Sequence, residues 1–437
     1  MKKTISIITL GCSKNTVDSE NLATRLNAKY NVVYGEHGNA DIVVINTCGF
    51  ILDAKQESID TILEYARMKH EGEIENLFVF GCLSERYKKE LVKEIPEVDE
   101  FFGVNSLDAI LDKLECCESV SCNGVRKIST PKHYAYIKIA EGCNRMCAFC
   151  AIPYIRGRYV SRTIEDIVNE VTLLADNGTT EFNLIAQDLS YYGKDIYGEY
   201  ALPRLLTELE KIAKVRWIRL HYTYPNNFPL EVLELMKSST KICHYLDIPL
   251  QHIHDRVLAK MKRGHTKQET LELISKIRCA VPDIALRTSL LVGFPGETDL
   301  AFAELEEFVK QTRFDRLGVF TYSAEEGTFS AEHYRDRISQ KEKQRRADRI
   351  MSIQQKISLE LNIAKIGKEY EIVIDRTEGD YYVGRTMQDS PEVDNEVLIK
   401  ISDAEDLKIG KYYTVQIIDA EEFDLYAVPV RQNEQNE

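Results

Sequence analysis

Unbroken runs of apolar residues, rather than runs that alternate with polar ones, recur along most of this chain. Residues 42–45 and 290–292 are two examples, and helical periodicity follows each of them. A strand that is apolar on both faces is typical of a parallel sheet covered by helices on both sides. The pattern therefore predicts an α/β protein. These runs are far too short to cross a membrane, so we expect no membrane partner.

The first segment, residues 1–130, repeats the alternation of strand and helix three times. It is expected to be an N-terminal domain built on a parallel α/β sheet. Residues 115–130 end before Pro131 and are typical of a connection between domains. The predicted strands are residues 4–10, 41–47 and 76–80, and the predicted helices are residues 18–28, residues 54–70 and the stretch after Ser84.

The second segment, residues 132–362, continues the same rhythm through six strand candidates. Six consecutive strand–helix units predict a partial (βα)6 barrel of parallel strands. A long charged helix is expected at its end, over residues 340–362. The strand candidates are residues 134–140, 181–186, 217–222, 245–249, 285–292 and 316–322.

The third segment, residues 364–432, changes character, because its strand-like runs are short and separated by turns. This predicts a small antiparallel β-barrel. From residue 364 to the last residue there are 18 acidic against 8 basic residues, a balance of −10 in a chain of net charge −14. A generally basic, phosphate-seeking surface is excluded. The strand-like runs are residues 369–375, 381–386, 396–401 and 412–419.

Eleven cysteines occur in the 437 residues. The number is odd, and no small-residue cleavage site follows the strand-like run after Met1-Lys2-Lys3, so we expect no signal peptide and a cytoplasmic location. A disulfide framework is the poorer interpretation in such a compartment. Metal ligands or catalytic thiols are the better one.

The strongest local signal is a C-x3-C-x2-C pattern formed by Cys143, Cys147 and Cys150, directly after the first strand of the second segment. Zinc sites favour paired C-x2-C units with partners further along, and neither a second pair nor a His pair is present. Three thiolates on one loop can hold three irons of a 4Fe–4S cluster. The fourth iron is then open to the amino and carboxylate groups of a ligand.

A second set of cysteines is spread along the first segment. Cys12, Cys48 and Cys82 each stand at the carboxyl end of a predicted parallel strand. In an open α/β sheet such strand ends converge on one crevice. Three thiolates meeting there would again suit a 4Fe–4S cluster with one open iron.

The run over residues 141–150 resembles the cluster motif of the radical S-adenosylmethionine superfamily. The resemblance implies that a cluster on its three cysteines binds S-adenosylmethionine and cleaves it to a 5′-deoxyadenosyl radical. Residues 186–188 stand where that superfamily contacts the methionine amine, and residues 292–297 stand near the adenine. The residues assigned to the cofactor in this way are Phe149, Gln187 and Gly293. Arg287 lies on a predicted barrel strand and is a candidate to pair with the cofactor carboxylate, the alternative being a pair with an Asp or Glu of the protein.

With two cysteine trios and a small terminal barrel, the whole chain resembles the methylthiotransferases. Their domains are an N-terminal cluster domain, a radical S-adenosylmethionine barrel and an OB-like TRAM barrel. One branch modifies adenosines of transfer RNA, and the other modifies an aspartate β-carbon in protein twelve of the small ribosomal subunit. Residues 10–20 and 245–252 resemble the ribosomal-protein branch. The acidic third segment agrees, since a module that grips RNA should be basic.

The resemblance implies that one S-adenosylmethionine methylates a sulfur held at the cluster on Cys12, Cys48 and Cys82. A second S-adenosylmethionine yields the radical at the cluster on Cys143, Cys147 and Cys150. The resemblance also implies a reductant such as flavodoxin or ferredoxin and a sulfur donor that the sequence does not identify, with nucleic acid not the primary partner. Asp247 and His252, at the end of the fourth barrel strand, are candidates for substrate contact.

Three alternatives stay open at this point. The first is a transfer RNA adenosine methylthiotransferase. The second is an iron–sulfur redox protein without turnover, and the third is a zinc protein. Iron content and cleavage of S-adenosylmethionine distinguish the last two from a radical enzyme.

Overall fold

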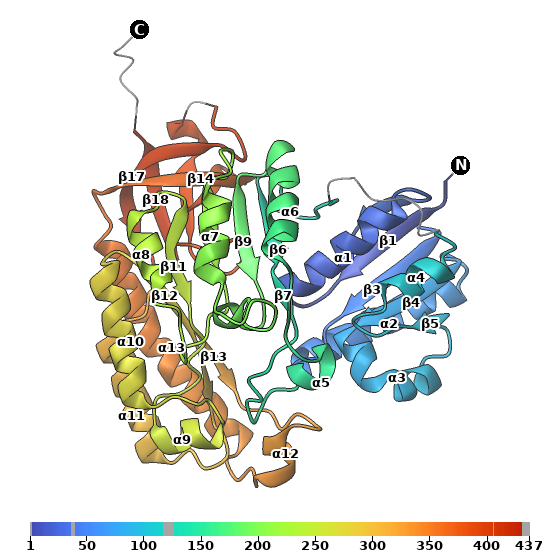
Figure 1. Ribbon diagram of the computed structural model, residues 1–437, viewed down its shortest axis with the longest axis horizontal. Coiled ribbons are helices and arrows are strands. Elements are labelled where there is room, and N and C mark those ends of the chain that lie inside the picture. The colour runs from blue at the N-terminus through green and yellow to red at the C-terminus, as the bar shows by residue number, and fades with distance from the viewer. Residues whose placement is uncertain (1, 36–39, 117–125, 405, 431–437) are drawn as a thin grey trace.

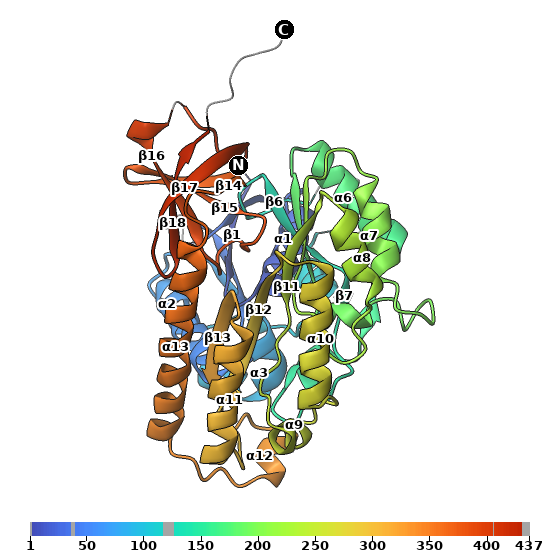
Figure 2. The ribbon, with the colours of Figure 1, turned by 90° about the vertical axis from the view of Figure 1, so that its left-hand side faces the viewer.

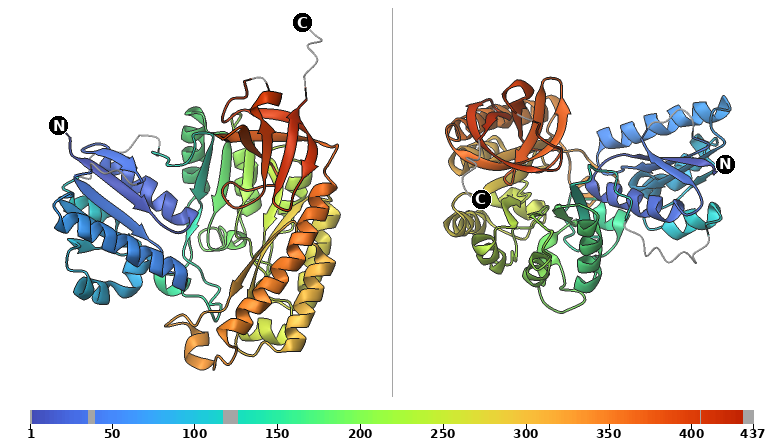
Figure 3. Two further views of the ribbon diagram at one scale, coloured as in Figure 1. Left: turned by 180° about the vertical axis from the view of Figure 1, so that it is seen from behind. Right: turned by 90° about the horizontal axis from the view of Figure 1, so that it is seen from above.

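A computed structural model describes residues 2–35, 40–116, 126–404 and 406–430 of the chain. The N-terminal sheet lies beside a larger central sheet, and a small barrel sits at one end of that central sheet (Figures 1 and 3). The predicted α/β class with a terminal β-barrel is confirmed. Across the described ranges, no helix is long and apolar enough to cross a membrane. The last two residues of the predicted third segment, 431 and 432, lie outside the described ranges.

Five parallel strands of the described chain form the N-terminal sheet, in the order β2-β1-β3-β4-β5. The central strand β3 is buried at every position, as its unbroken apolar run predicts. One core packs α1 and α4 against the sheet, and a second core packs α2 and α3. The elements are β1 (Thr4–Thr9), α1 (Ser13–Leu26), β2 (Asn31–Tyr34), β3 (Ile42–Thr47), α2 (Leu52–His70), β4 (Asn76–Gly81), α3 (Cys82–Glu94), β5 (Glu100–Phe101) and α4 (Leu107–Lys113).

The central domain is a six-stranded parallel sheet within the described residues, ordered β13-β12-β11-β10-β9-β6. This confirms the predicted partial barrel. Helices α10, α11 and α13 cover its outer face in Figure 2. The strands are β6 (Tyr134–Lys138), β9 (Glu181–Ile185), β10 (Trp217–Leu220), β11 (Ile242–Asp247), β12 (Ala285–Val292) and β13 (Arg316–Thr321).

Between these strands the chain forms helices and short loop elements. The long helix α13 begins where the charged run predicts it. However, Lys343 and Arg346 of that run are buried and hydrogen-bond to backbone carbonyls at the ends of β13 and β12. The elements are β7 (Ala140–Glu141), α5 (Ile152–Arg156), β8 (Val160–Ser161), α6 (Ile164–Asp176), η1 (Leu189–Tyr191), α7 (Leu202–Glu210), α8 (Glu231–Ser238), α9 (Asp255–Lys260), α10 (Lys267–Ala280), α11 (Asp299–Thr312), α12 (Phe329–His333) and α13 (Gln340–Ile363).

The C-terminal module is a closed barrel in the order β14-β15-β16-β18-β17. Its pairings are antiparallel except for β16 with β18, which is parallel. Strand β18 has no counterpart among the predicted runs, because acidic residues precede it and only six residues pair. The elements are β14 (Glu369–Glu378), β15 (Tyr381–Thr386), β16 (Glu396–Lys400), η2 (Ile401–Asp403), β17 (Tyr412–Ala420) and β18 (Asp424–Pro429).

A buried ion cluster joins this module to the central sheet. Glu181, at the start of β9, lies between Arg219 of β10 and Arg385 of β15. All three side chains are almost wholly buried. Because a buried charge is costly unless it is paired, the two domains depend on each other at this contact.

Candidate functional site

Cys48 and Cys82 lie side by side at the carboxyl edge of the N-terminal sheet. The parallel register pairs Thr47 with Gly81, and each cysteine directly follows one of these two residues. Cys12 reaches the same edge because it directly follows Gly11, whose backbone, at φ +91°, comes so close to Cys48 that a Cβ there would lie 2.7 Å from the Cβ of Cys48. The structure therefore brings together the three cysteines that sequence reasoning grouped.

The second trio lies on one loop between β7 and α5. The amide of Cys143 donates to the carbonyl of Gly157 over 3.1 Å, and the amide of Cys150 donates to the carbonyl of Cys147 over 3.0 Å. Ala148 between them ties the loop to the wall of the barrel, since its amide donates to the carbonyl of Met261 over 2.9 Å. The loop is thus held at the carboxyl ends of the barrel strands.

Two cationic side chains flank this loop. Arg263 donates from Nη1 to the Sγ atom of Cys147 over 3.3 Å, and its guanidinium stacks on the ring of Tyr224. Arg145 donates from Nε to Asp188 over 2.6 Å, and its guanidinium also stacks on the ring of Tyr224. Such groups stabilise thiolate charge on the loop.

The two trios lie on either side of one interface between the domains. Cys82 packs in one apolar cluster with Ala151, the residue after Cys150, and with Ile155. Arg156, which ends α5, donates to Asn15 Oδ1 over 2.6 Å, and that oxygen lies 4.0 Å from the sulfur of Cys82. Figure 1 shows α1 beside β6 on the same side of the molecule. Both trios therefore border the same interface between the domains.

The thiols fit iron–sulfur clusters in their chemistry. Burial raises the pKa of Cys82 to about 11, and burial also raises the pKa of Cys143 to about 11. Within each trio, one thiolate also disfavours the deprotonation of the next cysteine. A metal that replaces the thiol protons relieves both the cost of burial and this repulsion. No three His, Cys, Asp or Glu side chains of the described chain converge closely enough to share one metal ion. A cube takes one thiolate per iron, so its ligands surround a volume instead of meeting at a point.

The structure places three of the four predicted cofactor residues close to the loop trio. Phe149 packs edge-on against Phe294, which follows Gly293 at the end of β12, with ring centroids 6.4 Å apart. Gln187 donates from Nε2 to Glu141 Oε1 over 3.0 Å, while its own Oε1 is buried without a hydrogen-bond partner. That unpartnered oxygen is available to a donor such as an amino group.

Arg287 lies elsewhere, in the interior of the barrel. Its Nη1 is 3.4 Å from Asp247 Oδ1, and its Nε is 3.4 Å from Asp394 Oδ1, on the loop between β15 and β16. These carboxylates raise the pKa of Arg287, although burial opposes them. The arginine is therefore already charge-balanced by carboxylates of the protein.

The two candidate substrate contacts have different surroundings. Asp247 is wholly buried beside Arg287 and accepts from the amide of Tyr222 over 3.2 Å, and burial raises its pKa. His252 is buried too, but its Nδ1 accepts from the amide of His254, and its charged neighbours are His254 and Arg346 of α13. Burial lowers the pKa of His252 to about 3. Asp247 faces the interface of the trios, and His252 faces the outer helices.

Sequence reasoning missed three residues of this interface, namely Lys14, Arg156 and Tyr222. The ammonium of Lys14 stands 3.8 Å from the centroid of the Tyr222 ring. Tyr222 has a φ of +61°, an uncommon value for a residue other than glycine. Lys14 directly follows the Cys12-Ser13 pair. This position next to a candidate ligand is the feature of the sequence from which Lys14 could have been singled out.

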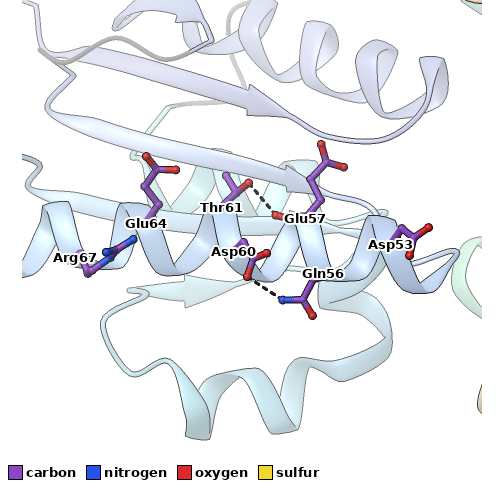
Figure 4. A pocket seen from close by; sticks show the side chains of 7 residues that line it. All are labelled: Asp53, Gln56, Glu57, Asp60, Thr61, Glu64 and Arg67. Atoms are coloured by element: carbon purple, nitrogen blue, oxygen red, sulfur yellow. Dashed lines mark hydrogen bonds between the residues drawn. The ribbon is translucent and has the colours of Figure 1, made fainter.

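A surface hollow lies along α2 (Figure 4). Its lining comes from that helix alone and includes no cysteine. Carboxylates predominate along it, with hydrogen bonds only between neighbouring turns. The lining residues are Asp53, Gln56, Glu57, Asp60, Thr61, Glu64 and Arg67.

Comparison with known proteins agrees with this architecture. Residues 137–309 match the radical SAM superfamily, residues 4–103 match the uncharacterized protein family UPF0004, and residues 366–430 match the TRAM domain. The ribosomal protein uS12 methylthiotransferase RimO of Bacteroides fragilis is 54% identical over 427 residues, which are 97% of this chain and 99% of that protein. The chain belongs to the uS12 methylthiotransferase family.

Other members of the uS12 methylthiotransferase family are similarly close. The RimO protein of Christiangramia forsetii is 53% identical over 430 residues, covering 98% of this chain and 95% of that protein. By family, this chain is a radical S-adenosylmethionine methylthiotransferase.

Solved structures share the fold at low identity. The radical S-adenosylmethionine methyltransferase TsrM from Kitasatospora setae superposes with a TM-score of 0.55 at 14% identity, covering 72% of each chain. The cobalamin-dependent radical enzyme OxsB gives a TM-score of 0.51 at 10% identity, covering 80% of this chain and 56% of that one.

Proposed function

We propose that this enzyme attaches a methylthio group to the β-carbon of an aspartate in ribosomal protein uS12. The observation that carries the proposal is that the two cysteine trios border the same interface between the domains. Relatives named for this activity match almost the whole chain. A single trio would account for a radical but would leave no place to hold the sulfur.

In this proposal, Cys143, Cys147 and Cys150 hold one 4Fe–4S cluster, and Cys12, Cys48 and Cys82 hold the other. When bound, these clusters and S-adenosylmethionine supply the radical and sulfur chemistry that an unactivated C–H bond requires. Phe149, Gln187 and Gly293 line the S-adenosylmethionine site beside the loop trio. Arg287 places a positive charge beside the carboxylates of Asp247 and Asp394 in the barrel interior.

The charge of the molecular surface supports a protein substrate over an RNA. The C-terminal module carries a balance of −10, and the α2 hollow is lined by four carboxylates against one arginine. Phosphate neutralisation dominates RNA affinity, so an RNA-gripping surface needs the opposite sign. A ribosomal protein rich in Lys and Arg is complementary to these surfaces. Nucleic acid is therefore not the primary partner in this proposal.

The proposal also covers the domain boundaries, the location of the enzyme and the donors of electrons and sulfur. We divide the chain into a cluster domain at 1–130, a radical domain at 132–362 and a TRAM domain at 364–432. Modification of a ribosomal protein implies a cytoplasmic location. A low-potential donor such as flavodoxin or ferredoxin supplies electrons, and a separate sulfur donor replenishes the cluster on Cys12, Cys48 and Cys82.

Mass spectrometry of uS12 from cells with and without this enzyme tests the proposal. We expect the added methylthio mass on one aspartate only when the enzyme is present. Transfer RNA from the same cells is analysed in parallel. Loss of methylthio-adenosine with unchanged uS12 would instead establish the RNA activity. An enzyme that, once reconstituted and reduced, does not cleave S-adenosylmethionine would be a redox protein.

A further inference from the structure

Lys14 is a buried lysine without an ion pair. Only 7% of it is exposed, and no described carboxylate lies within ion-pair distance of its ammonium. Its neighbours across the same interface differ in this respect, since Lys138 and Arg156 both pair with Asp18 and with Glu141. A buried polar group without a partner is costly, so such a group indicates a ligand that completes it.

The position of Lys14 is at the meeting point of the two domains. It lies in the first turn of α1, two residues after Cys12, and its ammonium covers the ring of Tyr222 at the carboxyl end of β10. Tyr222 holds its left-handed φ of +61° while its amide donates to Asp247. Strained backbone of this kind persists where the surrounding structure requires it, and it clusters at binding sites. The ammonium therefore stands between the first trio and the mouth of the barrel.

The nearby protein carboxylates do not satisfy Lys14. The carboxylates that act on it are those of Glu141 and Asp247. Glu141 already pairs with Lys138 and Arg156, and Asp247 pairs with Arg287. The aromatic face of Tyr222 offers a favourable but weaker contact than a carboxylate would. Since no carboxylate of the described residues pairs directly with Lys14, we look for such a partner in a bound ligand.

We propose that Lys14 binds the side-chain carboxylate of the target aspartate. The inference rests on the proposed function, which requires that the β-carbon of this aspartate lie between the two cysteine trios. A carboxylate held by Lys14 is one bond from that carbon. A charge-assisted hydrogen bond from an ammonium also distinguishes aspartate from asparagine, which has the same shape without the charge.

A purely structural role for Lys14 would give a different result. In that role the ammonium would only offset the negative charge of Cys12 and its cluster. Removing it would then weaken the site for every peptide alike. The preference for aspartate over asparagine is therefore the readout that separates ligand binding from structural support.

The test measures binding of two peptides to the reconstituted holoenzyme by fluorescence anisotropy. Both span the uS12 target loop, and they differ only in carrying Asp or Asn at the target position. We expect wild type to prefer the Asp peptide by about 10- to 100-fold, the range for a hydrogen bond to a charged group. Lys14→Met should abolish this preference by weakening the Asp peptide alone. Lys14→Arg should restore part of it.

Lys365→Met is the matched control, because Lys365 is another buried lysine without an ion pair within the described residues, located between α13 and β14. It should keep the wild-type preference. An equal loss of affinity for both peptides in Lys14→Met, or an unchanged preference, overturns the inference. If wild type neither binds nor methylthiolates the Asp peptide, the proposed function itself fails. Methylthiolation by wild type, with the preference retained in Lys14→Met, overturns only the role of Lys14.

Discussion

The two cysteine trios reach similar arrangements by opposite routes. Cys143, Cys147 and Cys150 stand within eight residues on one loop, so local backbone hydrogen bonds are enough to gather them. The other trio comes from three strands, and only the parallel register of β1, β3 and β4 brings its members together. One site is thus a property of a loop, and the other is a property of a whole sheet.

This difference predicts different sensitivities. A change in the loop should damage the radical site alone, since the barrel core does not depend on the loop trio. A change in the register of the N-terminal sheet should separate three thiols at once, because a slip of one residue moves every side chain to the other face. The following predictions test this contrast, beginning with the largest expected effect.

Removing one ligand from each trio should give two distinct losses. Cys147→Ala should eliminate cleavage of S-adenosylmethionine, whereas Cys82→Ala should retain cleavage and yield no methylthio product. Each variant should keep about four of about eight irons per chain, because the other cluster is intact. Iron analysis and product chromatography measure both effects. Cys279→Ala, at an exposed cysteine outside the trios, should keep all the iron. Loss of all iron from either variant would show that the sites are not independent.

Arg156→Gln should uncouple the trios. This arginine bridges Asp18 and Asn15 of the N-terminal domain to Glu141 of the barrel, and breaking a buried ion pair costs about 3–5 kcal/mol in the free energy of unfolding. Denaturant titration measures this loss, and the ratio of product to 5′-deoxyadenosine should fall with it.

Arg162→Gln is the control for that experiment, since its carboxylate partners, Asp166 and Glu170, both lie within the barrel domain. It should lower stability less and leave the product ratio unchanged. If both variants changed the ratio equally, the bridge across the domain interface would have no special role.

Alanine at the glycine before each trio should damage only that trio. Gly11 and Gly142 both have positive φ, and a Cβ at Gly142 would lie 2.1 Å from the carbonyl oxygen of Arg158. We expect each substitution to cost about 1–3 kcal/mol of unfolding free energy. Gly11→Ala should lose the first cluster with cleavage retained, and Gly142→Ala should lose cleavage. The reverse assignment would contradict the contrast between sheet and loop.

Mild acid should loosen the barrel before the N-terminal sheet. Burial lowers the pKa of His252 to about 3 and the pKa of His265 to about 4, below the value near 6.5 of an unfolded histidine. The unfolded chain therefore binds more protons, so this stability is present above about pH 6.5 and is lost as the pH falls toward 4 and then 3. No histidine of the described N-terminal sheet is buried. Hydrogen exchange at pH 7 and pH 5 should show the larger loss of protection in the barrel, and an equal loss would refute this.

Periodicity was enough to predict the layers of the fold. The unbroken apolar runs indicate β3 and the last three residues of β12, because every one of these positions is buried. Edge strands β2 and β5 were not predicted, since four and two residues are too few to carry a pattern. Helix α1 begins five residues earlier than expected because Cys12, which is not a usual capping residue, takes the extended position before it.

The candidate site was predictable where its residues have a characteristic spacing or follow a strand. Both trios meet one of these conditions. The roles of Lys14 and Arg156 could not be predicted, because each depends on how one domain packs against another. The separation of Asp247 from His252 likewise depends on which side of the strand end each residue faces. Short-range patterns carry no information about such contacts.

The loop between β15 and β16 has a consequence for engineering. It extends from the C-terminal barrel into the central sheet, where Ser390 meets His221, Asp389 meets Arg316, and Glu392 accepts from two tyrosines of β6. A foreign terminal module grafted onto this enzyme would need to bring residues 387–395 with it. Without them, water would enter between charges that are now sealed. Redesign of the module therefore has to be confined to its outer strands, while the loop that meets the central sheet is kept unchanged.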